Sequence, residues 1–112
     1  MGAVAVAVVL AAGCAVFASP LRADAAPAPE RAAQLVRMVR QDCGSCHGMR
    51  LTGGLGPALT PEALHDKPAD SLAATILHGR SGSAMPPWRP FVTDAEVAWI
   101  VEQLRRGFPD ER

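Results

Sequence analysis

The sequence C-G-S-C-H at residues 43–47 constrains this chain more than any other stretch. Cysteines three positions apart lie on one side of a helical turn, so both thiols can reach the same flat partner. They can form thioethers with two vinyl groups on one edge of a porphyrin, while the histidine that follows offers a ring nitrogen to its iron. This spacing is the attachment signature of c-type haem. It predicts one haem c, bound covalently through Cys43 and Cys46, with His47 as an axial ligand.

Two other kinds of site use a C-x-x-C pair. A redox dithiol of the thioredoxin type needs a βαβ context, and the sequence after residue 25 shows no strand pattern. A zinc site needs a second pair of ligands, and no other closely spaced Cys/Cys or Cys/His pair occurs. Haem attachment is therefore the interpretation that the surrounding sequence favours.

The N-terminal segment predicts export. Residues 3–18 form an apolar run that is too short for a membrane span and typical of the core of a signal peptide. The sequence Ala23-Asp24-Ala25 fits an A-x-A cleavage site, so we expect a cleaved signal peptide at residues 1–25 and a cytochrome domain at residues 26–112. Residues 16–18 offer a second possible cleavage site.

Other interpretations of the leader stay open. No Lys or Arg precedes the apolar run, which leaves a start upstream of Met1 or a retained N-terminal anchor as alternatives. Residues 11–14, A-A-G-C, also resemble a lipoprotein cleavage site behind a short apolar run. Cleavage would remove Cys14 and leave only the C-x-x-C pair, which suits a periplasm where cytochromes are matured.

Size and charge narrow the possible functions. The domain is small, and chains of this size have small hydrophobic cores that often need a covalent cross-link or a bound metal for stability. A covalently attached haem in the interior would provide such stabilisation. The formal net charge is +0, so no strong attraction to nucleic acid or lipid headgroups follows.

Apolar residues at helical spacing predict several helices. We expect helices over residues 31–43 and 67–78, and a short turn that begins at Pro61 with Thr60 as its cap. A capping box from Thr93 to Glu96 opens the last helix, which should run to about Arg106.

A second axial ligand is needed on the haem face opposite His47. Five side chains could supply it: Met38, Met49, Met85, His65 and His78. Met49 is too close in sequence to cross over, and Met38 belongs to the first helix, where a core position is expected. Met85 lies on an irregular loop that Pro86 stiffens, so we expect it to be the ligand.

Two histidines are possible alternatives to Met85 as the second ligand. His78 would give a bis-histidine site, although its place just before Gly79 favours a histidine that interacts with the last helix carbonyls. We expect His65 to be exposed without a role in the site.

Several neighbours of these ligands have candidate roles. An iron-bound imidazole donates its other N–H to an acceptor, and the carbonyl of Pro57 is well placed for this. The glycines before Pro57 should let the backbone lie close to a flat ligand. Arg80, Trp88 and Arg89 flank Met85 and could donate to the haem propionates, ordinary surface side chains being the alternative.

The order of these features over residues 31–108 resembles the small class I c-type cytochromes: helix, C-x-x-C-H, Gly-Pro loop, methionine loop and C-terminal helix. The resemblance implies an all-α fold of three to five helices wrapped around a single haem, with the first and last helices crossing. Three stretches, G-G-L-G-P-A-L-T at 53–60, I-L-H-G-R at 76–80 and A-M-P-P-W-R-P-F at 84–91, are also similar to the cytochrome c55X family of denitrifying bacteria.

That second resemblance implies a periplasmic electron carrier rather than an enzyme. Its expected partners are dissimilatory nitrite reductase and a donor from the respiratory chain, with no nucleic acid and no small-molecule substrate, and with a membrane only if the leader is retained. The family's alternative role is that of a haem-bearing factor in maturation of the reductase or its haem d-type cofactor. A gas sensor or a peroxidase is a further alternative, which would need an open position on the iron.

Overall fold

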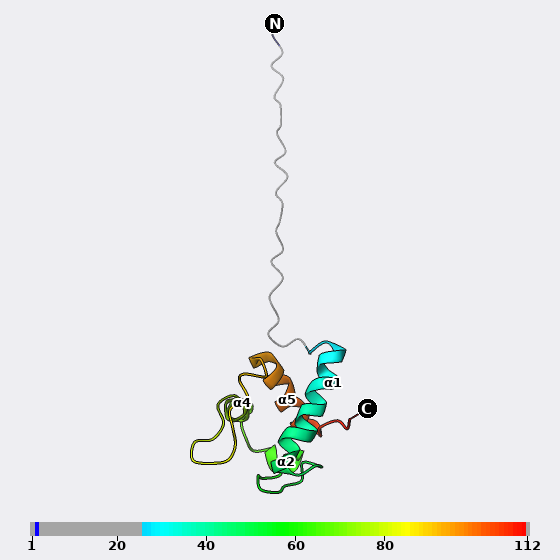
Figure 1. Ribbon diagram of the computed structural model, residues 1–112. Coiled ribbons are helices and arrows are strands. Elements are labelled where there is room, and N and C mark those ends of the chain that lie inside the picture. The colour runs from blue at the N-terminus through cyan, green and yellow to red at the C-terminus, as the bar shows by residue number, and fades with distance from the viewer. Residues whose placement is uncertain (1, 3–25, 112) are drawn as a thin grey trace.

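The computed structural model describes residue 2 and residues 26–111. Apart from residue 2, the expected signal peptide lies outside these residues, together with its three candidate cleavage sites and Cys14, as does Arg112. The described part is all-helical, with no strand, as expected from the sequence (Figure 1). Its helical elements are α1 (Pro29–Met38), η1 (Val39–Cys43), α2 (Gly44–His47), α3 (Pro61–Leu64), α4 (Ala69–His78) and α5 (Asp94–Arg106). No helix among the described residues has the length and apolar character needed to cross a lipid bilayer.

The first three elements follow one another without a break and carry the C-x-x-C-H sequence at their end. The helix begins at Pro29, two residues earlier than expected, because proline is well tolerated in the first turn, where its missing N–H has no partner to lose. The stretch η1 is π-helical. A π-helical turn contains more residues than an α-helical turn, so it changes the direction in which the following side chains point. Cys43 is the last residue of that turn.

The last helix, α5, has the predicted start and the predicted buried stripe. The hydroxyl of Thr93 accepts a hydrogen bond from the Glu96 N–H at 3.2 Å, and the Glu96 carboxylate accepts one from the Thr93 N–H at 2.8 Å. This is the capping box, and both bonds satisfy N–H groups that the helix itself leaves without partners. The side chains of Val97, Ile100, Val101 and Leu104 are buried along one side of α5.

The two middle helices are close to expectation. Thr60 caps α3, and its hydroxyl accepts a hydrogen bond from the Ala63 N–H at 3.3 Å. Helix α4 begins at Ala69 rather than at Lys67. The reason is Pro68, which takes the capping position with an extended backbone (φ −60°, ψ 137°) and so starts the helix one residue later.

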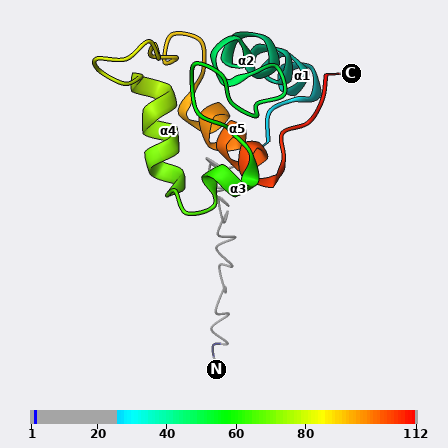
Figure 2. The same cartoon turned by 90° about the horizontal axis from the view of Figure 1, so that it is seen from below.

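The core lies around α5, which packs against α3 and α4 and crosses the first helix (Figure 2). One apolar cluster joins all of these elements, and its buried members are Leu35, Val39, Leu51, Leu64, Leu77, Val92, Val97, Ile100, Val101, Leu104 and Phe108. Met38 and Trp99 are half-buried against this cluster. The crossing of the first and last helices, implied by the family resemblance, is therefore present.

The C-terminal tail folds back onto the π-helical turn. The guanidinium of Arg40 lies 5.6 Å from the centre of the Phe108 ring and donates to the Pro109 carbonyl at 2.9 Å. Because Arg40 belongs to η1, these contacts connect the C-terminal tail to the π-helical turn that ends at Cys43.

Candidate haem site

The two cysteines occupy neighbouring turns of helix. Cys43 closes η1 and Cys46 lies in α2; both side chains are half-buried free thiols. Burial raises the pKa of the Cys43 thiol to about 11, and the negative charge of Asp42 adds to this effect. A redox dithiol instead depends on a lowered thiol pKa that yields a reactive thiolate. The surroundings of Cys43 therefore suit a thioether better than a dithiol that cycles.

The imidazole of His47 is held in one orientation. Its Nδ1 lies 2.7 Å from the carbonyl oxygen of Pro57. A carbonyl can only accept, so Nδ1 carries the proton and the lone pair of Nε2 remains for a metal. This is the hydrogen bond that metal-bound histidines make to fix their ring.

Gly56 supports the same ring from its side. A Cβ built on Gly56 would lie 2.7 Å from both Cε1 and Nδ1 of His47, a distance that real atoms do not tolerate. Only glycine therefore allows the backbone to lie this close to the imidazole. In the structure, Gly56 makes this close approach to the flat ring of His47.

The loop after α2 is tied to the end of that helix by backbone hydrogen bonds. The Gly53 N–H donates to the His47 carbonyl and the Gly56 N–H donates to the Cys46 carbonyl, each at 2.8 Å. Carbonyls at the end of a helix lack intrahelical partners, and these bonds satisfy them. The loop is consequently a fixed support for His47. Leu55 at its tip is 93% exposed.

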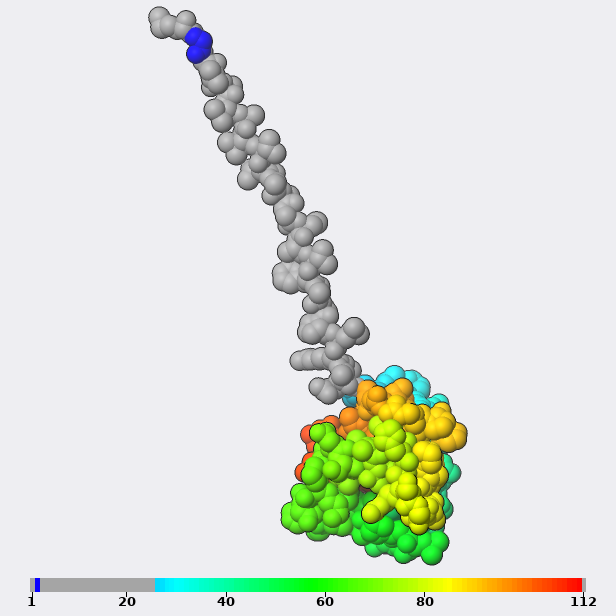
Figure 3. Space-filling view, turned by 90° about the vertical axis from the view of Figure 1, so that its left-hand side faces the viewer, coloured from blue at the N-terminus to red at the C-terminus, as the bar shows by residue number. Residues whose placement is uncertain are grey.

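Met85 lies on the second loop, residues 79–90, which leaves α4 and leads to α5. Its side chain is half-buried. Figures 1 and 3 show this loop, in yellow, at the same end of the molecule as α2 and the glycine-rich loop. Further along, the Trp88 N–H donates to the Ile76 carbonyl at 3.0 Å and the Arg89 N–H donates to the Leu77 carbonyl at 3.3 Å. The last turn of α4 therefore determines where this loop lies.

The residues expected around Met85 have different surroundings. Trp88 is half-buried against the core, with its ring centre 5.8 Å from that of Phe91. Arg80 is exposed. The guanidinium of Arg89 donates to the carboxylate of Asp94 at 3.0 Å, a contact that the sequence did not suggest. Arg89 thus already has an acidic partner within the chain.

The remaining candidates for an axial ligand have other positions. Met49 is 65% exposed, and Met38 packs on the core as expected. His78 is exposed as the last residue of α4. His65 is exposed as well, and its Nδ1 lies 3.0 Å from the Glu62 carbonyl oxygen.

The donor set of this region fits a haem c. Two thiols on successive turns, an imidazole with a free Nε2 and a thioether on a separate loop are the donors that such a group requires. Half-buried apolar side chains, among them Leu59, Leu72 and Ile76, pack on the core and leave apolar surface for a flat partner. Within residues 26–111, no three His, Cys, Asp or Glu side chains gather as a site for a metal ion, so the zinc interpretation has no second pair of ligands there.

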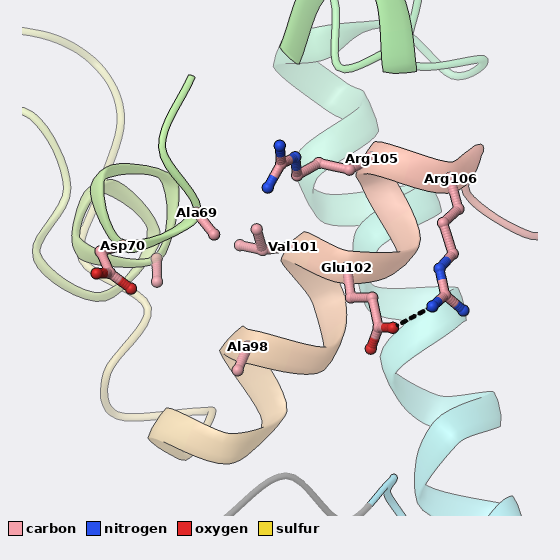
Figure 4. Close-up of a pocket in the computed structure, with 8 residues that line it drawn as sticks. Ala69, Asp70, Ala98, Val101, Glu102, Arg105 and Arg106 are labelled. Atoms are coloured by element: carbon pink, nitrogen blue, oxygen red, sulfur yellow. Dashed lines mark ion pairs between the residues drawn. The ribbon is translucent and has the colours of Figure 1, made fainter. Parts of the chain in front are cut away.

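A hollow between α4 and α5 is separate from this region (Figure 4). Its lining includes the ion pair of Glu102 and Arg106, together with small side chains such as Ala69 and Ala98. None of the residues that we expect to hold the haem contributes to it.

Known proteins similar to this chain are c-type cytochromes. A family described as cytochrome c oxidase, cbb3-type, subunit III, matches residues 29–103. The cytochrome c55X of Stutzerimonas stutzeri is 57% identical over 90 residues, which are 80% of this chain and 80% of that protein. A solved structure of the c-type cytochrome NirC superimposes with a TM-score of 0.71 at 56% identity and covers 72% of this chain and 95% of that one.

A larger protein is also similar. The dihydro-heme d1 dehydrogenase of Pseudomonas aeruginosa is 39% identical over 75 residues, which are 66% of this chain but only 15% of that enzyme. The similarity to the smaller cytochromes is both higher and more complete. The chain therefore belongs to the family described as cytochrome c oxidase, cbb3-type, subunit III and, within the c-type cytochromes, to the cytochrome c55X family.

Proposed function

We propose that this cytochrome is an exported monohaem carrier that passes single electrons to dissimilatory nitrite reductase. Its cytochrome c55X and NirC relatives are electron carriers rather than enzymes, and their type belongs to denitrification. The observation that carries the proposal is the fixed His47 ring, whose Nδ1 is bonded to Pro57 and whose Nε2 is free, next to two thiols on one helical run. When bound, a haem supplies the one-electron couple between ferrous and ferric iron.

The chain's own residues then have distinct roles. Cys43 and Cys46 would hold the haem through thioethers, and His47 and Met85 would supply the two protein ligands to its iron. The carbonyl of Pro57 fixes the imidazole. A thioether ligand stabilises ferrous iron and raises the reduction potential relative to a second histidine.

Arg80, Trp88 and Arg89 complete the proposed site as donors to the propionates. A buried carboxylate needs such partners because it loses its hydration. Of the two arginines, Arg89 contacts Asp94, whereas Arg80 has no acidic partner among residues 26–111.

Two filled axial positions distinguish this proposal from a gas sensor or a peroxidase, both of which need an open position on the iron. The proposed location is the periplasm, after cleavage of residues 1–25. Attachment to a membrane would follow only if that segment were retained.

Electron delivery can be tested with purified proteins. The fully reduced cytochrome is mixed with nitrite reductase from the same bacterium and with nitrite, and oxidation of the haem is followed by its visible absorbance. We expect oxidation that depends on both reductase and nitrite. Reduced Met85→Ala serves as a comparison with altered ligation. No oxidation beyond the rate seen without reductase would refute the proposed partner.

A second function, in maturation of the haem d-type cofactor, is favoured by the similarity to dihydro-heme d1 dehydrogenase. A dehydrogenase of that name removes electrons from dihydro-haem d1, and a one-electron carrier could accept them one at a time. A deletion strain separates the two functions. A pure donor leaves the reductase with its full cofactor complement, whereas a maturation partner leaves it deficient.

A further inference from the structure

The loop that carries Met85 closes on itself through the hydroxyl of one serine and through backbone hydrogen bonds. The hydroxyl of Ser83 donates to the Arg80 carbonyl at 2.8 Å and accepts from the Met85 N–H at 3.3 Å. The Arg80 N–H in turn donates to the Met85 carbonyl at 3.2 Å. One hydroxyl can donate and accept at the same time, so Ser83 joins the two ends of a six-residue turn. Both backbone polar groups of Met85 are held in this way.

Gly79 lies directly beneath the same backbone. A Cβ on Gly79 would lie 2.6 Å from the Met85 carbonyl oxygen and 2.8 Å from the Pro86 carbonyl carbon. Its φ of +68° is also one that glycine adopts without strain. The chain therefore leaves α4 at the one residue that lets the methionine backbone lie against the helix end.

These contacts are unusual in an otherwise exposed loop. Residues 80–84 are exposed and consist of Arg, Ser, Gly, Ser and Ala. Such a segment makes few apolar contacts, and ordering it costs conformational entropy that packing does not offset. The backbone of Met85 is fixed by its hydrogen bond to the Ser83 hydroxyl, by the bond from the Arg80 N–H and by the close approach at Gly79.

We propose that Ser83 and Gly79 are positioning residues that hold Met85 in place as the sixth ligand. This proposal rests on the proposed axial role of Met85. It states that the strength of the methionine–iron bond depends on the closed turn and not on Met85 alone. A loosened turn would let an external ligand compete more successfully for the iron.

Ser83 can be tested by competition with imidazole in the ferric holoprotein. Ser83→Ala removes both hydrogen bonds of the hydroxyl. Because a single such bond is worth about 2- to 10-fold, the apparent Kd for imidazole should fall by at least that factor. Ser83→Thr keeps the hydroxyl and should restore the Kd to within about twofold of the original. Ser81→Ala is the matched control, because Ser81 is exposed in the same loop and outside these hydrogen bonds.

Gly79 has an equally close control in Gly82. Both have a positive φ, +68° and +75°, so alanine is strained at either position. Only at Gly79 does the new Cβ meet Met85; at Gly82 it meets nothing within 4 Å. Gly79→Ala should therefore weaken the sulfur-to-iron charge-transfer band of the ferric protein, and Gly82→Ala should leave it intact. Circular dichroism checks that both variants are folded.

The outcomes separate this proposal from the one on which it rests. If Met85→Ala keeps the sulfur-to-iron band, Met85 is not the ligand, and the proposed positioning role of Ser83 and Gly79 fails with that assignment. If Met85→Ala loses the band but Ser83→Ala binds imidazole as Ser81→Ala does, the ligand is right and the role of Ser83 is overturned. Equal bands in Gly79→Ala and Gly82→Ala overturn the role of Gly79. The Ser83 test stands even if Gly79→Ala does not fold.

Discussion

Arg31 and Glu96 form a two-pronged ion pair that joins the first turn of α1 to the first turn of α5, with N–O distances of 2.6 Å and 3.2 Å. The Arg31 guanidinium also donates to the Phe91 carbonyl at 2.9 Å. The hydrogen bond from Arg31 holds the pKa of Glu96 below its ordinary value, against the opposing effect of burial, and the Thr93 N–H contributes in the same direction. One carboxylate thus holds the helix crossing and the capping box together.

Glu96 should make the fold sensitive to acid. Its pKa is lower in the folded protein, so the unfolded chain takes up the proton first as pH falls. The contribution of Glu96 is therefore complete above the unfolded pKa of about 4.3 and is lost as pH falls through the folded value. At pH 7, Glu96→Gln should have a lower melting temperature, because its free energy of unfolding falls by up to about 1 kcal/mol. Between neutral and acid pH, the variant should lose less stability than the original protein.

Thermal melts followed by circular dichroism at both pH values measure this effect. Glu102→Gln is the control, because Glu102 forms an ion pair of the i,i+4 type on an exposed part of the same helix. Identical pH dependence in the two variants would show that Glu96 has no special role.

Gly56→Ala should disturb the imidazole of His47. The added methyl group would meet the ring at 2.7 Å, and overpacking of this kind costs about 1–3 kcal/mol. We expect lower thermal stability and a changed haem spectrum. Gly44→Ala is the control, because its Cβ would have only ordinary contacts from 3.5 Å and would lie in a helix. Equal effects from the two substitutions would contradict the role assigned to Gly56.

The thioethers can be tested by mass. The mature protein should contain one covalent haem that acid and ketone do not extract, and Cys43→Ala/Cys46→Ala should lose it. Cys14→Ala should have no effect, since the domain's attachment depends on the C-x-x-C-H sequence alone. Extraction of the haem from the unaltered protein would rule out covalent attachment.

The domain should be unstable without its haem. Its buried apolar core has only eleven members, and a domain of this size has little further apolar surface to bury. Circular dichroism of protein made without haem maturation should show little cooperative melting, in contrast to the holoprotein. A sharp transition in the apoprotein would mean that the helices pack adequately by themselves.

Local signals in the sequence predicted the local structure well. The cap of Thr60 and the capping box of Thr93 and Glu96 need only residues three positions apart, and both are present. The predicted start of α4 is two residues too early, because apolar spacing does not take account of Pro68, which occupies the capping position before the helix.

Contacts between distant residues were harder to foresee. The π-helical turn before Cys43 has no residue signature, since it depends on which carbonyl each N–H selects. The sequence suggested that Pro57 accepts a hydrogen bond from His47, but not that Gly56 lies against the ring. Likewise, the pairing of Arg89 with Asp94 depends on how the loop meets α5. Charge alone could not decide whether Arg89 faces a propionate or an acid of its own chain.

The assignment of Met85 as sixth ligand makes the sharpest prediction. Met85→Ala should open the iron to carbon monoxide and lower the reduction potential by on the order of 100 mV, a small part of the roughly 0.8 V that axial ligands span. Met85→His should remain low-spin and still have a lower potential, because imidazole favours ferric iron more than a thioether does. The sulfur-to-iron band of the ferric protein should vanish in both variants. Met38→Ala is the control, since Met38 packs on the core. A band that survives in Met85→Ala and disappears in Met38→Ala would transfer the axial role to the first helix.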